Sequence, residues 1–251
     1  MSRYDPETEL ELNSGAENQQ GLRHNIQINW LIVSAIATII LWQIPWGNYL
    51  LYPFSILATW FHEMGHGLTA LFLGGNFQKL EIFANGSGLA THSGSLFLGR
   101  VGRALVAAGG PLGPAIAGSL FILAGRNRKT AKYILLFLGA LLVVSALIWV
   151  RSAFGALVIP LWGLAILGIA LRAPRSFHVP TIQFLGVQAC VSTYHQVGYL
   201  FTHRVVINGQ RIPSDTGQIA QQLFLPHWFW ASLICLISIF LLVQSLRLSR
   251  E

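Results

Sequence analysis

The residues with the clearest capacity for chemistry are His62, Glu63 and His66, the ionisable members of the pentapeptide His-Glu-Met-Gly-His. Positions four apart lie on one face of an α-helix, so the two imidazoles can bind one metal ion together. Glu63 directly follows the first histidine and can act as a general base toward a water activated by that metal. Because this spacing is typical of zinc hydrolases, the pattern indicates a catalytic metal site.

A catalytic zinc ion usually takes a third ligand from the protein, and few carboxylates are available for it. Five of the nine acidic residues lie within the first 17 positions. Apart from Glu63 and the terminal Glu251, only Glu81 and Asp215 remain. Glu81 follows the motif closely, where a solvent-exposed strand residue is expected. Asp215 is the favoured candidate, although a place at the positive end of a helix capped by Ser214 stays open as its alternative role.

The motif lies inside an apolar run, Leu50–Leu73, that is long enough to cross a bilayer as a helix. At ~1.5 Å per residue the run extends over about 36 Å, and a hydrocarbon core is about 30 Å thick. His62 then lies near mid-depth. A surface loop does not reach that depth, so a ligand at Asp215 requires residues 204–225 to fold into the bundle or a cavity.

The composition is that of a membrane protein. Only 10% of the residues are charged and 53% are hydrophobic, whereas soluble domains carry about 25% charge. Apolar runs of spanning length recur along the chain, at residues 28–44, 50–73, 101–124, 133–150, 153–171, 181–201 and 223–243. We therefore predict an all-α polytopic protein with about six to seven transmembrane helices, inserted in the cell membrane as a multi-pass protein.

One β element is expected in this helical protein. The segments 77–84 and 89–95 flank Asn85-Gly86, a hairpin signal, so a small β-hairpin should follow the motif helix. Residues 1–27 are polar and acidic, and we expect a disordered tail there. Residues 28–246 are then expected to form a single transmembrane domain that contains the metal site.

Three further patterns bear on packing and on the site. Gly109, Gly113 and Ala117 repeat every four positions, which favours a close contact between helices. Polar residues share one face of the run 181–201, where interhelical hydrogen bonding is the favoured interpretation and a wet path or substrate contact is the alternative. They are Gln188, Ser192 and His195. His92, near the hairpin, is a further residue able to approach the site.

The net charge of +7 raises the question of nucleic acid as a partner. The basic residues lie at the ends of apolar segments, a placement that suits lipid headgroups rather than a phosphate-tracking patch. We therefore predict the lipid bilayer as a partner and no nucleic acid. Cys190 and Cys235 both lie in apolar stretches and have no disulfide or zinc-type spacing. The sequence leaves the oligomeric state open.

Taken together, the spanning helix with residues 62–67 (His-Glu-Met-Gly-His-Gly), the glycine-rich hairpin and the small-residue helix with Gly110-Pro111 resemble the site-2 protease family of intramembrane zinc metalloproteases. The chain is most similar to the compact bacterial-type branch without a PDZ domain, in which a Ser-Asp-Ala segment lies near the last helix. Here that segment is Ser214-Asp215-Thr216, and Trp228-Phe229-Trp230 follows it. The likeness covers roughly residues 50–240.

This resemblance implies specific roles for the site residues. It implies His62, His66 and Asp215 as ligands of Zn²⁺ and Glu63 as the catalytic base. It also implies that the hairpin pairs with an unwound strand of a membrane protein substrate, as in β-strand addition.

The leading functional hypothesis is therefore a membrane-embedded zinc metalloendopeptidase that hydrolyses peptide bonds of membrane-inserted or membrane-proximal proteins. A membrane di-iron desaturase or hydroxylase is a second enzyme class, because His62 and His66 also fit an HxxxH box; no HxxHH box occurs in this sequence. A proteolytically inactive family member that binds membrane proteins is the non-enzymatic alternative.

Overall fold

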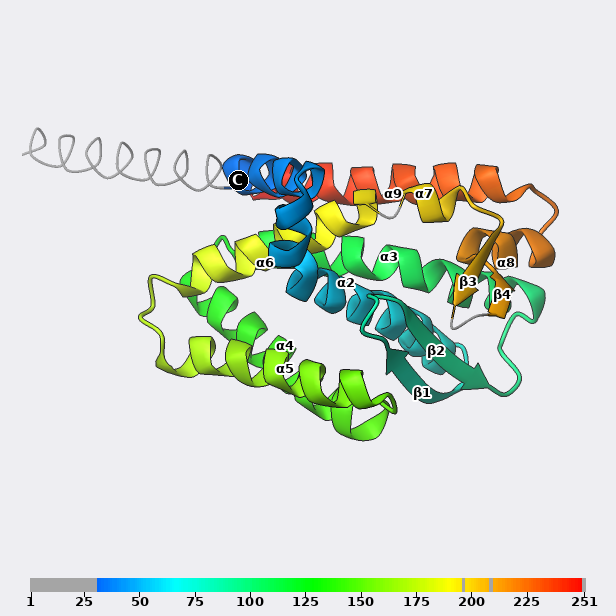
Figure 1. Ribbon diagram of the computed structural model, residues 1–251, viewed down its shortest axis with the longest axis horizontal. Coiled ribbons are helices and arrows are strands. Elements are labelled where there is room, and N and C mark those ends of the chain that lie inside the picture. Colours follow the sequence, from blue (N-terminus) through cyan, green and yellow to red (C-terminus); the bar gives the residue numbers. More distant parts are fainter. Residues whose placement is uncertain (1–30, 196, 208–209, 250–251) are drawn as a thin grey trace, which may run out of the picture.

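A computed structural model describes residues 31–195, 197–207 and 210–249, and the predicted tail at 1–27 lies outside these residues. The described chain is mostly helical, with two small antiparallel hairpins (Figure 1). The all-α class with a hairpin after the motif helix is therefore confirmed. The helices are α2 (Pro45–Phe72), α3 (Arg100–Ala124), α4 (Arg128–Ile148), α5 (Ala153–Arg172), α6 (His178–His195), α7 (Val197–Leu200), α8 (Asp215–Gln222) and α9 (His227–Leu248). The strands are β1 (Asn76–Ile82), β2 (Gly88–Ser93), β3 (Arg204–Ile207) and β4 (Gln210–Pro213), and a further helical segment, Leu31–Gln43, precedes α2.

Among the described helices, four are long and apolar enough to cross a membrane, namely α3, α4, α5 and α9. The polytopic class is thus retained, but the predicted number of six to seven spans is not reproduced by length and hydropathy. Leu31–Gln43 is shorter than a span. In α2 and α6 polar side chains interrupt the apolar sequence, and the span predicted over 181–201 is divided between α6 and α7.

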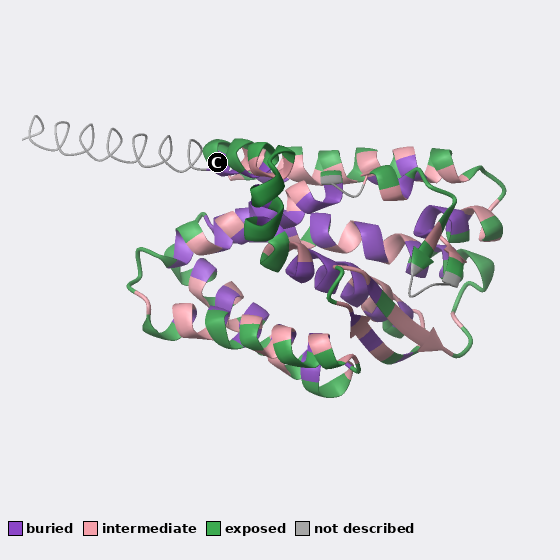
Figure 2. Ribbon diagram, in the orientation of Figure 1, coloured by how far each residue is buried: buried purple, intermediate pink, exposed green. Residues whose placement is uncertain are grey.

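The helices differ in how much of their apolar surface other elements cover. In the most apolar window of α3, 56% of the residues are buried, against 17% in α9. Large side chains such as Leu147 of α4, Leu161 of α5 and Phe240 of α9 are more than half exposed. Figure 2 shows such exposed residues along the outer helices and the buried ones concentrated between α2, α3 and the first hairpin. The outer faces are therefore suited to contact lipid acyl chains.

Helices α2 and α3 pack against each other at glycines. A Cβ on Gly65 would lie 2.1 Å from the carbonyl oxygen of Gly109, and one on Gly113 would lie 2.5 Å from that of Phe61. Both distances are far below van der Waals contact, so these positions require the absence of a side chain. The close helix contact predicted from the spacing of small residues is confirmed.

Replacing Gly113 by Ala is expected to lower the free energy of unfolding by about 1–3 kcal/mol, because the new methyl group forces apart two backbones. Thermal unfolding of the purified protein in detergent measures this loss. Gly168→Ala in α5 is the matched control, since a Cβ there meets nothing within 4 Å. Equal stability of the two variants would contradict the tight contact between α2 and α3.

The first hairpin has one covered edge and one free edge. β1 and β2 pair antiparallel, with Leu80 opposite Ala90. On the other side of β1, the N–H of Leu80 donates to the carbonyl of Trp149 (2.8 Å), and its carbonyl accepts from the N–H of Arg151 (3.0 Å). The connection between α4 and α5 therefore covers the outer edge of β1. No described strand pairs with the outer edge of β2.

The second hairpin, β3–β4, is absent from the elements that the sequence predicts. Its strands pair antiparallel, with Val205 opposite Ile212, and β4 leads directly into α8. Figure 1 places this hairpin at the same end of the molecule as β1–β2. The segment 204–225 thus folds against the bundle, as a role for Asp215 in the site requires, and α8 packs on α3.

The polar face of α6 is used for helix packing. The side-chain amide of Gln188 donates to the hydroxyl of Thr38 at 2.7 Å, and both residues are buried. The hydroxyl of Ser192 donates to the carbonyl of Ala189 within the same helix. These contacts agree with interhelical and local hydrogen bonding; the side chain of His195 lies outside the described part.

Candidate metal centre

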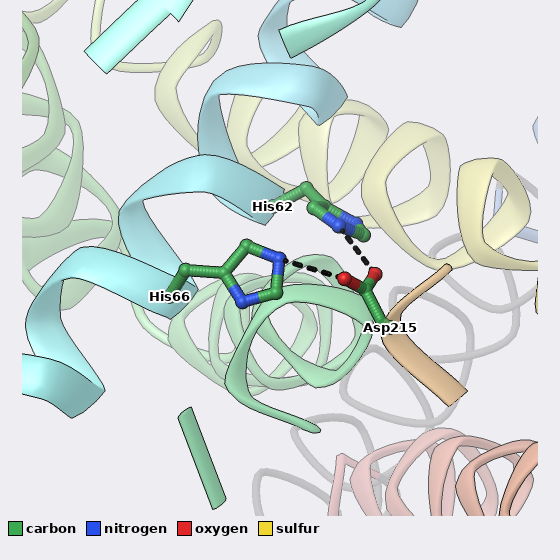
Figure 3. Close-up of side chains that lie close together, drawn as sticks. All are labelled: His62, His66 and Asp215. Atoms are coloured by element: carbon green, nitrogen blue, oxygen red, sulfur yellow. Dashed lines mark ion pairs between the residues drawn. The ribbon is translucent and has the colours of Figure 1, made fainter. Parts of the chain in front are cut away.

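Helix α2 presents His62 and His66 on one face, and α8 brings Asp215 opposite them (Figure 3). Nε2 of His62 lies 3.0 Å from Oδ2 of Asp215, and Nε2 of His66 lies 3.3 Å from Oδ1. The possible ligand atoms of the three residues all lie within 4.8 Å of one another. Glu81 is not part of this group; it forms an ion pair with Lys79 at 2.8 Å on β1.

The hydrogen bonding of His66 determines which of its nitrogens faces the group. Nδ1 lies 2.8 Å from the carbonyl oxygen of Val106 on α3, which can only accept. Nδ1 therefore carries a proton, and Nε2 is the nitrogen that faces Asp215, where it can bind a metal or, in the protonated ring, donate to Oδ1. A metal cation bound by both atoms, or a proton on Nε2, satisfies this arrangement.

The donor set fits a divalent metal. Two imidazole nitrogens and one carboxylate are ligands that zinc takes in catalytic sites, with one position left open. Ligand atoms at about 2.1 Å from a tetrahedral zinc ion lie about 3.4 Å apart. The two separations between histidine and Asp215 are close to that value. In addition, Nδ1 of His62 is buried without a hydrogen-bond partner among the described residues.

Helix α3 leaves space for His66 at a single glycine. A Cβ on Gly110 would lie 2.1 Å from Nε2 of His66. Any larger residue would displace the imidazole. Val106 and Gly110, one turn apart on α3, thus orient and accommodate the same side chain.

The backbone around Asp215 is held by its neighbours. The hydroxyl of Ser214 accepts from the N–H of Gly217 (3.1 Å) and so caps α8, and it donates to the carbonyl of Thr202. Thr216 donates to the carbonyl of Leu200 at 2.6 Å. Because Ser214 performs the capping, the side chain of Asp215 is directed at the histidines instead.

Asp215 is buried, with 3% of its surface exposed. Burial acts to raise the pKa of its carboxyl, but the charges of His66 and His62 together act more strongly and hold that pKa below its usual range. The carboxylate is therefore ionised near neutral pH, as a metal ligand must be.

Tyr199 is absent from the residues that the sequence predicts for the site. Its hydroxyl donates to Oδ2 of Asp215 at 3.2 Å, and its ring centroid lies 6.2 Å from that of His62. It orients the carboxylate from the short helix α7. No spacing in the sequence connects Tyr199 with the motif, because the contact arises only when α7 and α8 fold together.

Glu63 and His92 lie beside the group. Glu63 is buried next to His62, and β2 passes so close that a Cβ on Gly88 would lie 2.6 Å from Cγ of Glu63. His92 lines the same recess, which is the less favoured of the two interpretations that the sequence allows for this residue. Burial, and then the charge of His66, lower the pKa of the His92 imidazole.

The comparisons with known proteins give one result. A family model described as Peptidase M50B-like matches residues 31–245, which includes every residue of the candidate centre. No curated protein and no solved structure matches the chain.

Proposed function

Because the chain belongs to the M50B-like peptidase family, which is the site-2 protease family, we propose that it is a zinc endopeptidase acting on membrane-inserted or membrane-proximal proteins. The family is one of membrane-embedded metallopeptidases, and the four apolar helices agree with a multi-pass protein. The proposal includes His62, His66 and Asp215 as the zinc ligands, Glu63 as the catalytic base, and residues 28–246 as the single metallopeptidase domain.

The observation that carries the proposal is the convergence of these side chains in a buried position. Burying ionisable groups costs several kcal/mol unless they are paired or bind a metal. Two histidines one helical turn apart and Asp215 from a distant segment meet here, and Glu63 lies buried next to His62. A purely structural role would hold the two histidines and Asp215 as buried ion pairs, an arrangement that is costly to desolvate.

A zinc ion bound by these residues supplies Lewis-acid polarisation of a carbonyl group and makes water acidic enough to lose a proton near neutral pH. A carboxylate oxygen of Glu63 accepts the proton of the attacking water and returns it to the leaving amine. Val106 fixes the tautomer of His66, and Tyr199 orients Asp215. The free edge of β2 offers backbone N–H and C=O groups to an extended substrate segment.

Removal of the metal tests this function. We expect the purified protein in detergent to cleave a library of unfolded peptides derived from a whole proteome, to lose this activity with 1,10-phenanthroline, and to regain it with Zn²⁺. Mass spectrometry of the products measures the cleavage. Unfolded peptides contain no helix that must unwind before cleavage, so the assay measures the hydrolysis of the peptide bond itself. Cleavage that survives chelation would contradict a metallopeptidase, and bound zinc without cleavage would favour the inactive binder.

A further inference from the structure

The recess at the candidate centre has two halves with different linings. They meet at His62, Glu63, Gly88 and Tyr199. Glu63, the proposed base, therefore lies at the boundary between the halves. When a peptide bond of a substrate lies beside Glu63, the residues on its N-terminal side and those on its C-terminal side lie in different halves of the recess.

One half is apolar and lies between the two hairpins. Val205 and Val206 of β3 line a cavity of about 370 Å³ together with the turn of the first hairpin. The hydroxyl of Thr59 donates to the carbonyl of Gly86 (2.7 Å), and that of Ser87 donates to Oδ1 of Asn85 (2.7 Å). The hydroxyl groups that line this half are thus already engaged. What remains available for contact is chiefly apolar surface, with 63% of Val206 exposed.

The other half is more polar, and outside the candidate centre Arg103 is the one lysine or arginine among its described lining residues. This half lies along α3, β2 and α8 and is lined by Arg103 and three glutamines, Gln218, Gln221 and Gln222. Nε of Arg103 donates to the side-chain oxygen of Gln222 at 2.9 Å, which directs the guanidinium along α8. Among the described residues, Arg103 has no ion-pair partner. An acidic or uncharged polar side chain complements this lining.

The direction of β2 relates the two halves to the direction of a substrate. The turn residues Gly86 and Ser87 lie in the apolar half, and β2 then runs through Leu89 and Ala90 to His92 in the polar half. Antiparallel pairing is the commoner and slightly more stable arrangement. A substrate strand antiparallel to β2 therefore has its N-terminal flank in the polar half and its C-terminal flank in the apolar half.

We propose that the cleft selects a segment with an acidic or polar residue on the N-terminal side of the scissile bond and an apolar residue on its C-terminal side. Arg103 recognises the first, and the apolar surface of β3 at Val206 recognises the second. The selection rests on the proposed peptidase function and adds to it the class of sequence that is cut. Such a segment occurs where a polar stretch passes into an apolar one, as at the boundary of a membrane span.

The cut sites in the proteome-derived peptide library test this selection. In the wild-type protein, we expect acidic residues to be about five times as frequent as basic ones on the N-terminal flank of the cut sites. A ratio of this size corresponds to the interaction of one partly exposed charge, that of Arg103, with the substrate. Apolar residues are expected to exceed charged ones on the C-terminal flank about tenfold or more. Arg103→Glu should invert the first preference and leave the second. Val206→Asp should abolish the second and leave the first.

Matched variants separate recognition from folding. Lys129→Glu changes the charge by the same amount at an exposed position on α4 and should change neither preference. Val206→Leu should retain the apolar preference. Gln218→Lys adds a positive charge to the polar half and should strengthen the acidic preference, which keeps the test decisive if Arg103→Glu does not fold.

The outcomes distinguish the two proposals. Cleavage that depends on Glu63 but shows no bias, a reversed order of flanks, or a bias unmoved by these substitutions would overturn the selection and leave the peptidase intact. Absence of any cleavage dependent on Glu63 would overturn both.

Discussion

Glu63→Gln is expected to retain zinc and to lose peptide hydrolysis by about 10²–10⁴-fold, the range that a general base contributes. Glutamine has the shape of glutamate but cannot accept a proton from water. Glu63 is not one of the three residues whose ligand atoms converge, so its replacement should leave the metal in place. Initial rates on the peptide library, together with the zinc content of the same preparation, measure the two effects separately.

Glu81→Gln is the matched control for this variant. Glu81 is a carboxylate of the same type, but it pairs with Lys79 on the first hairpin and lies outside the converging group. Its replacement should leave both the rate and the zinc content unchanged. Equal rates for Glu63→Gln and the wild type would refute the role of Glu63 as the base.

Asp215→Ala is expected to lower the affinity for zinc by more than about 100-fold. Replacing a residue that only hydrogen-bonds to a metal ligand lowers the affinity by at most about that factor, and a ligand itself should matter more. The substitution removes both oxygens that face His62 and His66. The cap of α8 depends on Ser214, so the helix should persist, and the loss should reflect the ligand itself. Titration of the metal against a competing chelator measures the affinity.

Glu81→Ala serves as the comparison here, because Glu81 is the other carboxylate that the sequence allows as a third ligand. It should bind zinc as the wild type does. Undiminished affinity in Asp215→Ala would move the third ligand to Glu81, a histidine or water.

The parts of the fold that the sequence predicts depend on local patterns. Helical spacing predicts the motif helix, a turn signal predicts the first hairpin, and residue size predicts the contact at Gly113. Each of these patterns is visible in the sequence without knowledge of tertiary contacts. The number of spans depends on tertiary contacts instead. In α6, for example, Gln188 lowers the hydropathy, and its polarity is satisfied only by Thr38 of another helix.

The second hairpin and Tyr199 show two different limits. Asn208-Gly209 lies between the strands of β3–β4 and is the same hairpin signal as Asn85-Gly86, but here it is embedded in a polar stretch that is typical of a loop. A signal was therefore present for the hairpin. Tyr199 has none, because its hydrogen bond joins two segments whose proximity only the folded chain creates.

The covered edge of β1 limits how another chain can pair with the first hairpin. A hairpin with two unpaired edges could form backbone hydrogen bonds with strands on both sides, including a strand of another copy of the chain. Here the connection between α4 and α5 closes one side, and the other side lies within the cleft beside Glu63. If the chain cleaves peptides as proposed, a substrate pairs with the first hairpin only as an extended segment along β2, and a segment that is still helical must unwind first.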